Sequence, residues 1–109
     1  MKIPQNAIIV PEKLTEYLLV PQTKNDKAQF LAQAGFAADN PATLEQAIRT
    51  LIAGNEAVQD RQDVYGTFYQ VTGELVGPNG IISVVTVWIL RTIDGQYRFV
   101  TLKPARRNR

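Results

Sequence analysis

The sequence predicts an α+β fold in which three N-terminal helices pack on one face of an antiparallel β-meander of three to four strands. Apolar residues recur every three or four positions as far as Gly54, and after it they recur every second position. The turn-forming stretches GPNG at 77–80 and IDGQ at 93–96 then divide the second half into consecutive strands. Because the helices precede the strands and do not alternate with them, we expect an antiparallel sheet with helices on one face.

The length of 109 residues is typical of one compact domain with a single core. Within this domain, 1–109, we expect a helical part at about 11–54, a sheet at about 56–103 and a basic tail at 104–109. The tail contains Arg106, Arg107 and Arg109. Its charge is compatible with an acidic or phosphate-rich partner, and equally with a solvated end.

Three helices are predicted from their spacing and their end signals. The first runs from about Pro11 to Leu19, and the second follows Asp26 and ends at Gly35, where Phe36 can fold back over the helix end. The third has Asn40 as its cap, proline at its first position and glycine at its exit, so it covers about 41–54.

Three strands are predicted at about 67–76, 81–92 and 96–103, and 56–65 is either a strand or a loop that leads into them. We expect Asp94 and Gly95 to form a two-residue hairpin turn that pairs Ile93 with Gln96. The GPNG turn pairs Val76 with Ile81 in the same way.

This register sorts the side chains by face, with Trp88 opposite Thr101 and Thr86 opposite Lys103. The face under the helices is then aliphatic and comprises Phe68, Ile81, Val85, Val87, Ile89, Val100 and Leu102. The uncovered face combines aromatic rings with hydroxyl groups and a cation, and comprises Tyr69, Thr86, Trp88, Tyr97, Phe99, Thr101 and Lys103.

The composition excludes several classes of chemistry. The chain contains no cysteine and no histidine, which removes disulfides, thiolate nucleophiles, the usual zinc sites and imidazole acid–base catalysis. We therefore expect no cofactor and no metal site. No apolar run is long enough to span a membrane and no signal peptide is recognisable, so we expect a cytoplasmic protein without membrane contact.

The uncovered face has the residue types that bind single-stranded nucleic acid, because rings stack on bases while lysine and arginine hold phosphates. Lys27, on the second helix, is expected to reach the rim of the sheet, and Arg91 and Arg98 are expected to face each other as a second anion point. Glu74 is a candidate carboxylate. The alternative is that Trp88 and its neighbours pack under the N-terminal segment or against a second copy of the chain in a homodimer.

The stretches KLTEYLL, DKAQFLAQAGF, VYGTFYQVTGELVGPNG, TVWIL and FVTLKP resemble a bacterial domain family of unknown function of about this length. Members of that family occur as small stand-alone proteins and at the ends of adhesin-like or phage-head proteins. The family commonly has histidine before the Lys-Ala pair, where this chain has Asp26. The layout is also similar to the ribonuclease fold shared by barnase, EndoU, colicin and RelE-like toxins.

The resemblance implies a toxin-like, metal-independent ribonuclease acting on RNA. In the catalytic set, Lys27 and Lys103 would hold phosphate, and Thr86 and Thr101 would donate hydrogen bonds. Tyr69 or Tyr97 would stack on a base or transfer a proton. The residues that bind the substrate would be Tyr69, Trp88, Tyr97, Arg91 and Arg98. The alternative is a non-catalytic module that binds a small protein through the aromatic face, as the antitoxin or immunity half of a pair. A small acidic antitoxin or immunity protein is accordingly the second expected partner.

Overall fold

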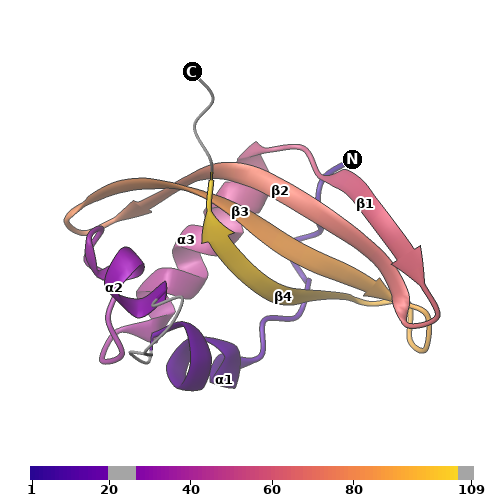
Figure 1. Ribbon diagram of the computed structural model, residues 1–109, viewed down its shortest axis with the longest axis horizontal. Coiled ribbons are helices and arrows are strands. Elements are labelled where there is room, and N and C mark those ends of the chain that lie inside the picture. Colours follow the sequence, from indigo (N-terminus) through magenta and orange to yellow (C-terminus); the bar gives the residue numbers. More distant parts are fainter. Residues whose placement is uncertain (20–26, 106–109) are drawn as a thin grey trace.

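The computed structural model describes residues 1–19 and 27–105. Helices come first in the chain and strands follow, as Figure 1 shows. The elements in order are α1 (Pro11–Lys13), the π-helical turn η1 (Leu14–Leu18), α2 (Lys27–Ala32), α3 (Pro41–Gly54), β1 (Val58–Asp63), β2 (Gly66–Gly77), β3 (Gly80–Arg91) and β4 (Tyr97–Pro104).

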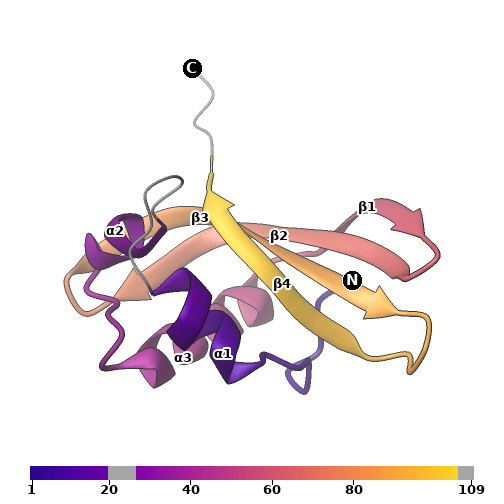
Figure 2. The ribbon, with the colours of Figure 1, turned by 60° about the horizontal axis from the view of Figure 1, so that its bottom comes forward.

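The four strands form one antiparallel sheet in the order β1-β2-β3-β4, with the helices on one side of it (Figures 1 and 2). The predicted α+β class and the antiparallel meander are confirmed. The predicted packing of three helices is not confirmed, because the helices before α3 are short. The first, expected from about Pro11 to Leu19, consists of three α-helical residues and the π-helical turn η1, and α2 has 6 residues. Among the described residues α3 is the longest helix, with 14 residues. No helix in the described ranges has the length and apolarity to cross a bilayer.

Helix α3 supplies the regular part of the helical layer. Pro41 stands at its first turn and Gly54 is its last residue, as predicted. Its apolar positions recur at helical spacing and are buried against the sheet: Leu44, Ala47, Ile48, Leu51 and Ile52.

The end of α2 is stabilised by the backbone bonds of a Schellman motif. Phe36 N donates to Leu31 O over 3.2 Å, and Gly35, at φ +93°, donates to Ala32 O over 3.0 Å. Phe36 and Leu31 are both buried, so the predicted fold-back is confirmed. The GPNG turn packs on this motif, because Asn79 N donates to Ala34 O over 2.9 Å. The predicted beginning of this helix at Asp26 and the arginines of the tail lie outside the described residues.

The register between β2 and β3 agrees with the prediction. Val76 pairs with Ile81, Tyr69 with Trp88, and Val71 with Thr86. The assignment of faces was nevertheless wrong. Trp88 and Thr86 have no exposed surface and lie on the helix side of β3, whereas Val85, Val87 and Ile89 are half-buried on the other face.

Burial of the largest ring explains this orientation. Both faces of β3 are apolar, so alternation alone does not tell which one the helices cover. On the helix side, the rings of Trp88 and Phe99 pack edge-to-face with their centroids 5.3 Å apart. Covering these two rings removes more apolar surface from water than covering the valines of the other face would. The Thr86 hydroxyl is tolerated there because it donates to Val71 O (2.9 Å) and accepts from Trp88 Nε1 (2.8 Å).

The hairpin between β3 and β4 has a four-residue loop, Thr92 to Gly95, in place of the predicted two-residue turn. Gly95 N donates to Arg91 O over 2.8 Å, and Arg91 N to Gln96 O over 3.0 Å. Trp88 therefore pairs with Phe99, not with Thr101.

A register shift between Val87 and Trp88 then adds one residue to β4. Val87 pairs with Thr101 and Val85 with Lys103, so Val100 has no partner of its own. Because side chains alternate along a strand, this β-bulge takes Thr101 and Lys103 off the face that carries Thr86 and Trp88. Thr101 meets helical residues at the edge of β4 instead. The predicted pairs Trp88–Thr101 and Thr86–Lys103 are wrong for this reason.

Candidate functional site

Three polar side chains from three separate elements meet beside the edge of β4. Lys27 Nζ, from the first residue of α2, donates to Thr101 Oγ1 of β4 over 3.0 Å. The same ammonium group lies 3.4 Å from Tyr17 Oη of η1, and 5.4 Å from the centroid of its ring. We call Lys27, Tyr17 and Thr101 the edge cluster.

The surroundings of Tyr17 lower its pKa below that of free tyrosine. The hydrogen bond with Thr101 is the largest cause that lowers the pKa of Tyr17, followed by the hydrogen bond with Lys27. Partial burial opposes this shift, and the charges of Lys27 and Lys13 support it. A phenol with a lowered pKa is a better proton acceptor near neutral pH than free tyrosine.

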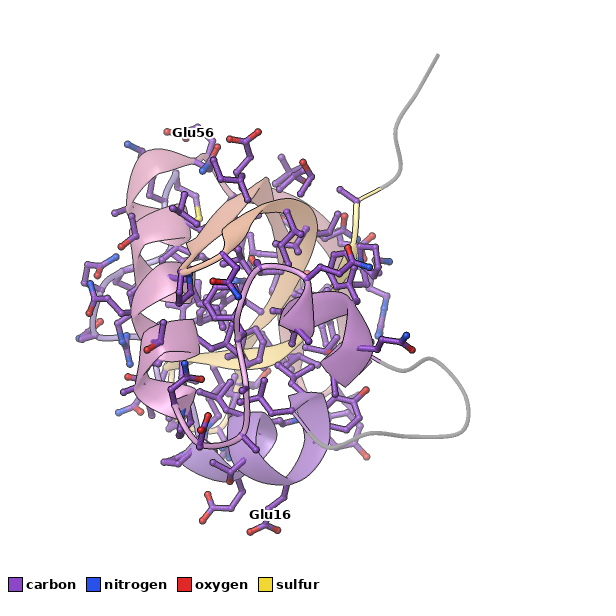
Figure 3. All side chains as sticks on the ribbon, turned by 90° about the vertical axis from the view of Figure 1, so that its left-hand side faces the viewer. Glu16 and Glu56 are labelled. Carbon is purple, nitrogen blue, oxygen red and sulfur yellow. The ribbon has the colours of Figure 1, made fainter. Side chains whose placement is uncertain are left out.

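The edge cluster opens onto a shallow pocket of about 490 Å³ between α1, η1 and β4. Tyr17 and Thr101 line this pocket together with Lys13, Glu12 and Glu16. Figure 3 shows Glu16 pointing outward from η1. The side chains that line the pocket therefore carry charges of both signs.

The structure brings together only two of the predicted catalytic residues, Lys27 and Thr101. Thr86 and Trp88 are sealed in the core and lack the accessible surface that a hydrogen bond to substrate or a stacked base requires. Lys103 is exposed, and it pairs with Val85 on the face away from the helices.

The predicted aromatic residues Tyr69 and Tyr97 form a pair elsewhere on the helix side of the sheet. Their ring centroids are 5.8 Å apart, both are half-buried, and Tyr97 Oη lies 4.0 Å from Met1 Sδ. Burial is the largest cause that raises the pKa of Tyr97, and Tyr69 adds to it. This pair packs against the core and is separate from the edge cluster.

The predicted opposition of Arg91 and Arg98 is also corrected by the register. Arg98 pairs with Ile89, and its Nε is buried without a hydrogen-bond partner among the described residues. The backbone of Arg91 bonds to Gln96, and its Nε lies 3.9 Å from Asp94 Oδ1. Arg98 thus lies opposite Ile89, two residues along β3 from Arg91, and the two arginines do not face each other.

Tyr17 was not predicted as a site residue. Its spacing of four residues from Lys13 puts both on one face of that turn. The contact with Thr101 depends on tertiary structure, which helical spacing does not reveal. Within 1–19 and 27–105, no group of three acidic side chains is arranged to hold a metal ion.

Comparison with known proteins gives a family but no function. No curated protein matches the chain. A family model described as a domain of unknown function, DUF6883, matches residues 2–106. The match covers almost the whole chain, and this chain therefore belongs to the DUF6883 family.

Proposed function

We propose that the chain is a toxin-like, metal-independent ribonuclease whose reaction centre is the edge cluster. The observation that carries the proposal is the hydrogen bond of 3.0 Å between Lys27 Nζ and Thr101 Oγ1, which holds a cation beside a tyrosine with a lowered pKa. Such a centre supplies a base and a phosphate-binding cation without histidine, which the chain lacks.

The reaction is an attack of the RNA 2′ oxygen on the adjacent phosphorus. The Tyr17 phenolate takes the proton of the 2′-hydroxyl, and the new P–O2′ bond forms while the P–O5′ bond breaks. Lys27 offsets the charge that develops on the phosphate and gives a proton to the leaving 5′ oxygen. The products are a 2′,3′-cyclic phosphate and a 5′-hydroxyl end, and the proton on Tyr17 returns to Lys27 across the 3.4 Å contact.

Thr101 acts as the positioning residue of this centre. Its hydroxyl oxygen accepts from Lys27 and fixes the ammonium group next to Tyr17. Lys13, with its Nζ 6.0 Å from the centroid of the Tyr17 ring, adds a second cation on the side from which phosphate approaches.

The test is cleavage of a fluorescent single-stranded RNA by the purified chain in the presence of a chelator. We expect Tyr17→Phe and Lys27→Ala to lower the rate by about 10²- to 10⁴-fold, the usual contribution of a general acid or base. Lys103→Ala, at an exposed lysine outside the edge cluster, is the matched control and keeps the rate within a few-fold. Loss of cleavage with Lys103→Ala but not with Tyr17→Phe would contradict a reaction centre at the edge cluster.

Growth of a host that expresses the chain gives an independent measurement. The wild type is expected to arrest growth, and Lys27→Ala is expected to relieve the arrest at equal expression. Absence of both cleavage and growth arrest in the wild type would reject the ribonuclease.

A non-catalytic protein-binding module is the second candidate, and one observation favours it. The β1–β2 and β3–β4 loops are joined by a hydrogen bond of 3.0 Å from Thr92 N to Tyr65 O. Three apolar side chains are widely exposed there: Val64 (82%), Tyr65 (74%) and Ile93 (81%). Exposed rings and aliphatic groups of this kind anchor protein interfaces. Capture of the product of a neighbouring gene, lost with Tyr65→Ala, would support this candidate.

A further inference from the structure

Within the described part of the chain, one half of β2 is an open sheet edge. Strand β1 pairs with β2 only from Gly66 to Gln70, and β2 continues to Gly77. Figure 1 shows β1 beside one half of β2 only. On its other side β2 is paired with β3 along its whole length.

The register identifies which backbone groups face this edge. In an antiparallel ladder, successive residues direct their N–H and C=O groups to opposite sides. Gly77 and Gly80 are partners across a two-residue turn, and the residues that flank such a turn form a hydrogen-bonded pair. The backbone groups of the odd-numbered residues of β2 therefore face β3. The N–H and C=O groups of Thr72, Glu74 and Val76 consequently point to the open edge.

A groove lies between this edge and α3. It has a volume of about 440 Å³, and its lining includes Glu74 and Val76 from β2 and a row of residues from α3. The row consists of small or polar side chains, Ala42, Thr43, Gln46, Ala47 and Thr50. Small residues leave room for alternate side chains of an added strand to lie against the helix.

Glu74 is the charged residue of this groove, and no lysine or arginine lines it within the described part of the chain. We propose that the open edge of β2 binds an extended peptide strand of a partner protein, with a basic side chain opposite Glu74. The unpaired backbone groups of β2 can bond only to a ligand whose own backbone is extended. The Glu74 carboxylate favours a strand with a positively charged side chain opposite it. This site is separate from the proposed ribonuclease centre, which lies at β4 on the other edge of the sheet.

A second copy of this chain is a poorer occupant. Two copies paired antiparallel about Glu74 would place two carboxylates opposite each other, and like charges so placed destabilise a sheet. A charged residue on an exposed edge is a common protection against such pairing. The same carboxylate that opposes self-association therefore favours a basic strand.

The first experiment measures hydrogen exchange of the free protein by NMR. We expect the amides of Thr72, Glu74 and Val76 to exchange much faster than those of Val71, Gly73 and Leu75, which are bonded to β3. Equal protection of the two sets would mean that the edge is already paired, and would overturn the proposal.

The second experiment titrates the protein with the capped heptapeptide VTVKVTV and follows the same amides. We expect saturable shifts at the three edge amides, and at least a tenfold loss of affinity when the lysine and both threonines of the peptide are N-methylated. Absence of shifts at millimolar peptide, or shifts that persist with the N-methylated peptide, would refute strand addition.

Charge exchange tests the selection by Glu74. Replacing the peptide lysine by glutamate is expected to weaken binding by roughly twofold to fivefold, the effect of one cross-strand ion pair. Glu74→Lys is expected to reverse the preference, and an unchanged preference contradicts the role of Glu74. Ala42→Trp fills the groove and abolishes binding, whereas Ala53→Trp, at an exposed position of α3 outside the groove, is the matched control.

Discussion

Lys27 Nζ and Thr101 Oγ1 are 3.0 Å apart although the two residues are separated by 74 positions in the sequence. The contact ties the beginning of α2 to the last strand of the sheet. It therefore has a measurable effect on stability as well as the proposed role in catalysis.

A double-mutant cycle measures this contact. We expect Lys27→Met and Thr101→Val each to lower the free energy of unfolding by about 1 kcal/mol, the usual worth of a hydrogen bond in a partly buried setting. The double variant should lose less than the sum, because both changes remove the same interaction. Urea denaturation gives the three values, and strict additivity would show that the two side chains do not interact.

The second prediction concerns the ionisation of Tyr17. Its hydrogen bonds with Thr101 and Lys27 lower its pKa, so Thr101→Val and Lys27→Met are each expected to raise the pKa of Tyr17 toward that of free tyrosine. NMR titration of the labelled ring carbon measures this directly. If Tyr17 is the base, the rise of the cleavage rate with pH moves to more alkaline pH by the same amount, whereas Lys103→Met leaves both curves in place.

The third prediction concerns the buried hydroxyl of Thr86. Thr86→Val removes the acceptor of Trp88 Nε1 and a donor to Val71 O, which leaves a buried indole N–H unsatisfied. We expect a loss of about 1 to 3 kcal/mol in the free energy of unfolding. The fluorescence of Trp88, the one tryptophan of the chain, reports the urea transition. RNA cleavage under folding conditions should be unaffected, and a selective loss of cleavage would restore Thr86 to the site.

The fourth prediction compares two glycines. A Cβ at Gly77 would collide with the carbonyl oxygen of Ala34, where the GPNG turn packs on the end of α2, and it would also crowd Phe36. Gly77→Ala should therefore lower the free energy of unfolding by about 1 to 3 kcal/mol. At Gly54, the last residue of α3, a Cβ would meet nothing within 4 Å. Gly54→Ala should be neutral or slightly stabilising, and equal melting temperatures for the two variants would contradict this packing.

Local patterns predicted the elements of the fold well. Proline and glycine mark the ends of α3, Gly35 marks the end of the second helix, and GPNG fixes the register of β2 and β3. These features were predictable because each signal acts within a few residues of the chain. The faces of the sheet were harder to predict. Trp88 and Val87 are adjacent apolar residues, and only the position of the helices decides which of them is buried.

The candidate site was predicted in part for a related reason. Lys27 and Thr101 were both selected, but the loop of Thr92 to Gly95 and the unpaired Val100 changed their neighbours. A bulge has no strong local signature, since any residue of an apolar strand can occupy it. The contact of Tyr17 with this site depends on how η1 packs against β4, which no short pattern encodes.

The unpaired Val100 decides which way the residues that follow it in β4 face. In a continuous ladder without the bulge, Val100 would pair with Val87 and Thr101 with Thr86, so Thr101 would turn inward and Leu102 would turn toward water. The Thr101 hydroxyl would then leave Lys27 while the order of the strands stayed the same. The extra residue thus lets Val100 and Thr101 both line the pocket beside α1, while Phe99 and Leu102 on either side of them remain buried.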